Sequence, residues 1–220
     1  MKYRTLLPTF LIFTQGIASA NLLGYWDFEA NFSDISGNGN DGTAIGNTTL
    51  DTTTAAAGTG SLKLVNADDS YLDINPGSGM NVADEPVFTI SMWVNSSTLQ
   101  DDKRIFSEGS TTSSAPLYNL GTGAPGTGSN QLDFYRRSAS ATTNDHNVTT
   151  AEPFGDSTTF GGIKREGPCC GFSGSLDDIA IWDVALNSDQ IQAIQMAVSP
   201  LRIDASLDAD ESSGQSVDSL

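Results

Sequence analysis

The chain has 220 residues, 38% of them hydrophobic, which is enough for one domain with a substantial core. The formal net charge of −17 gives a surface that repels phosphate backbones, so nucleic acid is excluded as the expected partner. The 22 glycines favour many short strands joined by turns over a helical bundle.

The N-terminus has the pattern of a secretory signal peptide. Lys2 and Arg4 precede a mostly apolar stretch at residues 6–17, and Ala18-Ser19-Ala20 fits the cleavage motif. We therefore interpret residues 1–20 as a signal peptide and expect a secreted or cell-surface protein. The alternative is an N-terminal membrane anchor, although the apolar stretch is shorter than the ~20 residues of a membrane span. No later segment is long enough to span a membrane.

A first strand is predicted at residues 22–29, followed by a turn-rich loop at 34–42. Alternation places Tyr25, Asp27 and Glu29 on one face of this strand. The loop is rich in Gly, Asn and Asp, which tolerate positive φ or bind nearby backbone amides.

Two further strands, at residues 61–65 and 71–74, are expected to pair with each other through a turn at 66–70. The most regular pattern spans residues 88–95. Its alternation places Phe88, Ile90, Met92 and Val94 on one face and Thr89, Ser91, Trp93 and Asn95 on the other.

The second half of the chain predicts more strands and one helix. The strands are expected at residues 104–108, 116–120, 131–137, 160–164 and 172–182. In the last of them, the change of parity between Leu176 and Ile179 predicts a bulge near the paired aspartates.

Residues 138–157 show no pattern that places them. Asn187 fits a helix N-cap, and Ile191, Ile194 and Val198 keep helical spacing up to Pro200. The acidic, Ser-rich residues 200–220 are expected to form a disordered tail or a linker.

The two cysteines, Cys169 and Cys170, are adjacent. A disulfide between neighbours is strained, because disulfides normally join Cα atoms about 4.4–6.8 Å apart. Free thiols or a bridge to another chain are the alternatives.

Three segments, taken in order, resemble the laminin G-like jelly-roll domains of the concanavalin A-like superfamily. They are Leu23 to Glu29 with Asp34 to Thr43, then Phe88 to Val94, and finally Phe172 to Asp183 with Ala185-Leu186-Asn187. The resemblance implies an all-β, two-sheet antiparallel jelly-roll sandwich over residues 21–199, with one short C-terminal helix. Its two sheets are expected to close around Trp26, Met92 and Ile181.

One departure concerns a strand with the sequence Trp-His-His-Val and the hairpin after it, which the family usually carries. Here only Asp145-His146-Asn147-Val148 stands in that neighbourhood. One or two strands are therefore expected to be missing or remodelled, which would leave an open sheet edge.

No catalytic residues are predicted. Glycosidases need two carboxylates at a defined separation, and the nearest imitation is Asp27 with Glu29, which we interpret as hydrogen-bonded structure. His146 is the single histidine and lies in a polar loop. We therefore expect a protein that is not an enzyme.

Calcium is the predicted cofactor, because hard cations prefer mixtures of carboxylate and amide oxygens. The candidate ligands are Asp34, Asn38, Asn40 and Asp178, since the family resemblance brings the last long strand beside the first. The alternative is that the loop residues stabilise a turn and that Asp178 caps amides at the bulge.

A glycan is the predicted partner, because many members of the resembling family bind sugars. Exposed aromatic rings stack on sugar faces, and the candidates are Tyr71, Tyr118, Tyr135 and Trp93. Arg136 beside Tyr135 would favour an acidic glycan; a solvated charge pair is the alternative. Trp26 and Trp182 are assigned to the core.

The sequence thus predicts a secreted, non-catalytic module that binds glycans, with calcium as a candidate requirement. A structural or adhesion domain and a degenerate glycosidase are the alternatives, because fold alone does not determine function.

Overall fold

A computed structural model describes residues 21–65, 69–96, 98, 100–113, 115, 117–123, 132–137, 156–165 and 167–203. The predicted signal peptide, residues 138–155 of the unplaced segment and residues 204–220 of the predicted tail lie outside this part of the chain.

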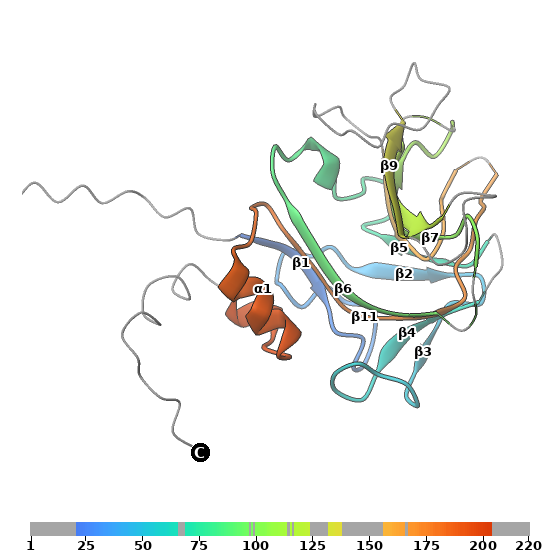
Figure 1. The fold of residues 1–220 in the computed structure, drawn as a ribbon. Coiled ribbons are helices and arrows are strands. Elements are labelled where there is room, and N and C mark those ends of the chain that lie inside the picture. The colour runs from blue at the N-terminus through green and yellow to red at the C-terminus, as the bar shows by residue number, and fades with distance from the viewer. Residues whose placement is uncertain are drawn as a thin grey trace, which may run out of the picture.

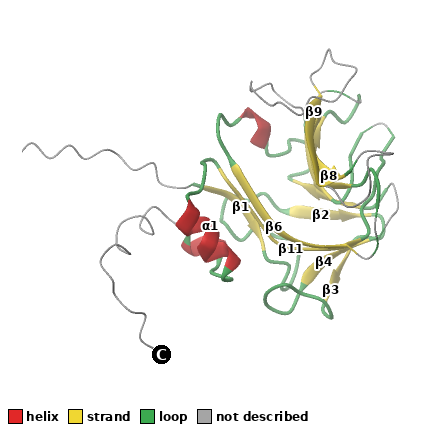
Figure 2. Cartoon of the chain, viewed as in Figure 1, coloured by secondary structure: helices red, strands yellow, loops and turns green. Residues whose placement is uncertain are grey.

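The described residues form two antiparallel sheets that face each other (Figures 1 and 2). The first sheet contains β1 (Leu22–Trp26), β3 (Thr49–Asp51), β4 (Ser61–Leu64), β6 (Thr89–Ser96) and β11 (Gly174–Trp182). The second contains, in spatial order, β2 (Gly42–Ile45), β5 (Tyr71–Ile74), β10 (Ser157–Phe160), β7 (Arg104–Gly109), β8 (Leu117–Thr122) and β9 (Leu132–Arg137). The predicted antiparallel β-sandwich is confirmed.

Large apolar side chains fill the space between the sheets. Trp26, Phe160 and Ile181 are fully buried, and Met92 packs against their cluster from its margin. The rings of Trp26 and Phe160 meet edge to face with centroids 5.0 Å apart. Burying each such side chain stabilises the fold by roughly 2–3 kcal/mol. The alternating pattern of the strands therefore favours a sandwich, because it places these side chains on the face that the other sheet covers.

Strand β11 runs through the middle of the first sheet. It pairs with β6 along one side, and with β4 and then β1 along the other. The register with β6 shifts between Asp177 and Ala180, and Asp178 has a φ of 47°. The predicted bulge at the paired aspartates is therefore confirmed.

The predicted pairing of residues 61–65 with 71–74 is wrong. Strand β4 pairs with β3 and β11 in the first sheet, whereas β5 pairs with β2 and β10 in the second. Leu62 and Leu72 both point into the common core from opposite sheets. The apolar pattern identified the buried faces correctly, but it carries no information about which strand lies alongside.

Helix α1 (Ser188–Gln195) begins as predicted. The side chain of Asn187 accepts hydrogen bonds from the amides of Asp189 and Gln190, and the Gln190 side chain accepts one from the amide of Asn187. The helix ends before the predicted Val198, because the chain turns away through Ala197, which has a φ of 60°.

Helix α1 packs against the outer face of the first sheet, in a cluster with Tyr25, Trp182 and Ile203 (Figure 1). Ile203 follows the 3₁₀ turn η2 (Pro200–Arg202) and is only 3% exposed, so the folded part extends beyond the predicted boundary at residue 199. A second 3₁₀ turn, η1 (Val82–Asp84), precedes β6. Within the described ranges, no helix has the length and apolar character needed to cross a membrane.

Candidate functional site

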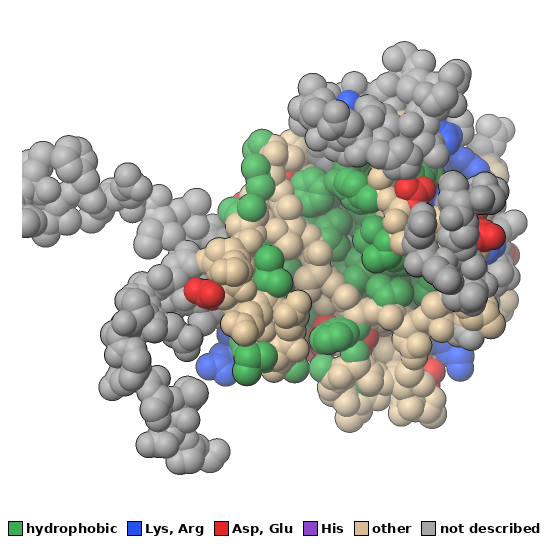
Figure 3. Space-filling view, in the orientation of Figure 1, with side chains coloured by type: hydrophobic (Ala, Val, Ile, Leu, Met, Phe, Trp, Pro, Cys, Tyr) green, Lys and Arg blue, Asp and Glu red, His purple; other side chains and the backbone are tan. Residues whose placement is uncertain are grey.

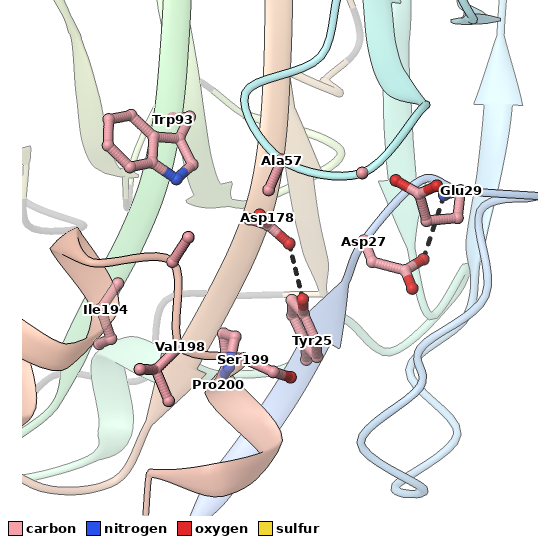
Figure 4. Close-up of a pocket in the computed structure, with 12 residues that line it drawn as sticks. Tyr25, Asp27, Glu29, Ala57, Trp93, Asp178, Ile194, Val198, Ser199 and Pro200 are labelled. Atoms are coloured by element: carbon pink, nitrogen blue, oxygen red, sulfur yellow. Dashed lines mark hydrogen bonds between the residues drawn. The ribbon is translucent and has the colours of Figure 1, made fainter. Parts of the chain in front are cut away.

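A hollow of about 200 Å³ opens on the outer face of the first sheet, beside helix α1. We call it the acidic cleft. Its lining includes Tyr25, Asp27, Glu29, Ala57, Gly58, Trp93, Asp178, Ile194 and residues 197–200. Figure 4 shows Trp93 on one side of the cleft and Asp27 with Glu29 on the other, with Tyr25 and Asp178 between them.

Asp178 and Tyr25 form the floor of the acidic cleft. The Tyr25 hydroxyl donates a 2.6 Å hydrogen bond to Oδ1 of Asp178. Burial raises the pKa of Asp178, and the charges of Asp27 and Glu29 raise it further, while the bond from Tyr25 opposes them. Burial and the bond to Asp178 hold the pKa of Tyr25 far above its usual range. Tyr25 therefore stays a donor, and Asp178 sits where a strained bulge residue can face a ligand.

Asp177 holds in place the loop of residues 54–58, which borders the cleft. It is 3% exposed, and its Oδ2 accepts hydrogen bonds from the amides of Ala56 (2.7 Å) and Ala57 (3.3 Å). These bonds fix the loop of residues 54–58 against β11. Burial raises the pKa of Asp177 to about 6.

Glu29 ties the same loop from the other side. Its carboxylate accepts bonds from the amide (2.9 Å) and the hydroxyl (2.8 Å) of Thr59, which lower its pKa. Gly58 has a φ of +61°, and a Cβ there would lie 1.9 Å from Oε1 of Glu29. Only glycine lets the loop approach Glu29 so closely.

Trp93 is the aromatic side chain that the cleft presents to solvent. It lies on β6, is 42% exposed, and also lines a second hollow of about 190 Å³. That hollow is bounded by residues 54–56 and by Asn95, Ser175 and Asp177. The two hollows share Trp93 and the loop of residues 54–58, so they form one elongated surface.

The structure separates the predicted calcium ligands. The carboxylate of Asp34 accepts bonds from the amides of Tyr25 (3.0 Å), Ser36 (2.9 Å) and Asn40 (3.0 Å). The side-chain amide of Asn38 donates to the carbonyls of Leu22 (2.6 Å) and Leu23 (3.2 Å).

The side-chain amide of Asn40 also donates to the Leu23 carbonyl, at 2.9 Å. Asp178 belongs to the acidic cleft instead. The amides that donate to Asp34 are those of a self-stabilised turn, which was the alternative to a calcium site; calcium binding stays a prediction. Among the described residues, no group of three or more His, Cys, Asp or Glu side chains is placed to hold a metal ion.

The predicted sugar-stacking tyrosines and their arginine require a correction, because all four side chains are buried. Tyr71 is 6% exposed, Tyr118 and Tyr135 are each 2% exposed, and Arg136 is 8% exposed. Tyr118 packs edge to face against Phe88 and Phe134 in the core. Tyr135 is covered by Ile163 and Cys169. These rings have no open face for a sugar, and Trp93 is the predicted aromatic that keeps one.

Cys169 and Cys170 are joined by a disulfide, with Cα atoms 3.7 Å apart. The bridge lies in the segment between β10 and β11 that covers Tyr135, and it lines neither hollow.

Sequence reasoning missed the Tyr25 hydroxyl, the loop at 54–58 and the segment after α1. Their convergence depends on contacts such as Tyr25 with Asp178, which are 153 residues apart in the chain. A signal existed for Tyr25, since it shares the strand face of Asp27 and Glu29. Loop 54–58 gave none, because its Thr and Ala residues carry no recognisable chemistry.

No model of a known protein family matches this sequence, and no curated protein matches it. Among solved structures, the chain is similar to domain 4 of AbnA, a GH43 extracellular arabinanase from Geobacillus stearothermophilus, in complex with arabinotriose. The TM-score is 0.54 at 15% identity, and the match covers 77% of this chain and 95% of the other. At this identity the likeness shows a shared β-sandwich fold.

Proposed function

We propose that this chain is a secreted, non-catalytic module of the concanavalin A-like kind that binds neutral glycans at the acidic cleft. The observation that carries the proposal is the exposed ring of Trp93 beside the Asp178–Tyr25 pair. A sugar ring has an apolar face for an aromatic side chain and hydroxyls for carboxylates.

The polar side of the cleft fits hydroxyl groups. Asp27, Glu29 and Asp178 are acceptors, and none of the cleft-lining residues carries a positive charge. An acidic or sulfated glycan would meet three carboxylates with no counter-charge, so the cleft favours neutral sugars. The chain's net charge of −17 acts in the same direction.

The structural neighbour suggests which sugar to test first. That domain was solved with arabinotriose, and it shares the sandwich fold over 77% of this chain. The two hollows on either side of the 54–58 loop give an elongated surface suited to an oligosaccharide.

Binding without hydrolysis is the part of the proposal that separates it from a glycosidase. The carboxylate of Asp27 accepts a hydrogen bond from the amide of Glu29 at 3.2 Å, which fits a structural role. The pKa of Glu29 is lowered by Thr59, which disfavours a general acid.

The experiment is calorimetric titration of arabinotriose and of a panel of neutral and uronic oligosaccharides. Trp93→Ala should weaken binding at least about tenfold, as loss of a central aromatic contact does. Trp93→Phe should recover part of the affinity, and Met196→Ala, at a 74% exposed side chain outside the cleft, should change nothing. Equal affinities for Trp93→Ala and the wild type would refute the site.

Two further arms test the remaining parts of the proposal. Titration with calcium or with EDTA checks the predicted calcium requirement. Release of reducing ends from arabinan that disappears in Glu29→Gln would establish a glycosidase instead.

A further inference from the structure

Among the strands that the structure describes, β6 lies at an open edge of the first sheet. Among the described strands it pairs with β11 alone, and none of its eight residues is fully buried. Natural proteins usually protect such an edge with lysine, proline or a bulge. Residues 89–96 contain no charged residue and no proline, so the edge lacks the first two of these devices.

An apolar groove of about 480 Å³ runs along this edge, lined by β6, by residues of the second sheet and by helix α1. Four of its lining residues are large exposed hydrophobics: Trp93 (42%), Val94 (41%), Leu132 (72%) and Ile191 (43%). Figure 3 shows hydrophobic side chains gathered in the hollow between the sheets. No residue that lines the groove is charged, although the chain carries 37 charged residues. Contiguous exposed apolar surface of this kind marks an interaction site.

We infer that β6 is the interface of a homodimer in which two copies of the chain pair their β6 strands antiparallel across a two-fold axis. The axis would stand perpendicular to the first sheet and join two five-stranded sheets into one. Such an axis keeps the same face of both strands on the core side. Ile90 and Met92 of each copy would then border the groove of the other.

The strand itself argues for a second copy as the occupant. Its alternating pattern is self-complementary, because apolar residues meet apolar residues on one face and the uncharged residues Ser91, Trp93 and Asn95 lie on the other. An antiparallel pair of β6 strands places no like charges opposite each other. Each copy carries a formal net charge of −17, and salt screens the repulsion between copies over about 8 Å at physiological ionic strength.

Sedimentation velocity of the full chain across a range of concentrations, at low and high NaCl, tests the proposal. We expect a reversible dimer that tightens as salt rises. Val94→Lys should raise the dissociation constant at least about tenfold, because inward-facing lysines block edge pairing. Ile35→Lys is the matched control, since Ile35 has a similar exposure (38%) but does not line the groove, and it should dimerise like the wild type.

Near-UV circular dichroism confirms that each variant is folded. Hydrogen exchange gives a readout that needs no variant: the amides of residues 89–96 should become more protected as concentration rises. A monomer at all concentrations, a dimer insensitive to Val94→Lys, or protection already complete at high dilution would overturn the proposal. The last result would mean that the chain's own segments or a different partner cover the edge.

Discussion

Two groups of acidic and amide side chains in this protein look alike in the sequence, but the structure places them in different surroundings. In the turn of residues 34–42, the side chains of Asp34, Asn38 and Asn40 form hydrogen bonds with backbone amides and carbonyls of the chain itself. In the acidic cleft, Asp27 and Asp178 line a hollow beside an exposed tryptophan. The first group holds the fold, and the second is available to a ligand.

The difference follows from what carries the side chains. A loop of Gly, Asn and Asp folds back on itself, so its oxygens find amides within a few residues. Asp178 projects from a bulge in a long central strand, where the side chain of Asp177 accepts the hydrogen bond of its backbone amide. Residue type alone therefore does not identify a binding site. A binding site is identified by side chains whose hydrogen-bonding atoms are not already fully bonded within the protein.

Removing the Asp34 carboxylate should give the largest effect. Asp34→Ala leaves three amides without their acceptor, and Asp34 is only 8% exposed, so we expect a loss of about 3 kcal/mol in the free energy of unfolding. Urea denaturation measures it, with the exposed Asn38→Ala as a control that should cost less than about 1 kcal/mol. If Asp34→Asn abolished a calcium-dependent affinity for glycan while the chain stayed folded, the turn of residues 34–42 would itself be a binding site and the comparison would be wrong.

Asp177 should make the free energy of unfolding depend on pH, with an effect of intermediate size. Its folded pKa of about 6 lies above the ordinary 3.8, so the folded chain retains a proton that the unfolded chain releases. The resulting stabilisation is complete below pH 3.8, falls as the pH rises to about 6, and is lost above that. The stability of the wild type relative to Asp177→Asn should decrease by about 2–3 kcal/mol across this window. Denaturation curves at several pH values show it; a constant difference would contradict the burial of this carboxylate.

The sequence predicted the fold better than the site, for a physical reason. Alternation at residues 88–95 and the capping residue Asn187 are local signals, and both elements appear where expected. The neighbour of each strand is set by contacts distant in the chain, so β4 and β5 were wrongly paired.

The same limit applies to the site. Asp27, Glu29, Trp93 and Asp178 were each singled out, for three different roles, and only the pairing of β11 with β1 and β6 brings them together. Tyr118 and Tyr135 failed as ligand candidates because alternation separates two faces without revealing that both are covered.

The smallest expected effect is the pH dependence of glycan binding. It tests whether the acidic cleft, unlike the turn of residues 34–42, is available to a ligand. The raised pKa of Asp178 means that it takes up a proton at a higher pH than an ordinary aspartate. A neutral carboxyl is a weaker acceptor of sugar hydroxyls than a carboxylate. Wild-type affinity for arabinotriose should therefore fall as the pH is lowered toward this pKa, while Asp178→Asn should bind about fivefold more weakly at pH 7, with a flatter profile. Parallel profiles for the two proteins, measured by calorimetry, would place the sugar away from Asp178 even if Trp93 proved essential.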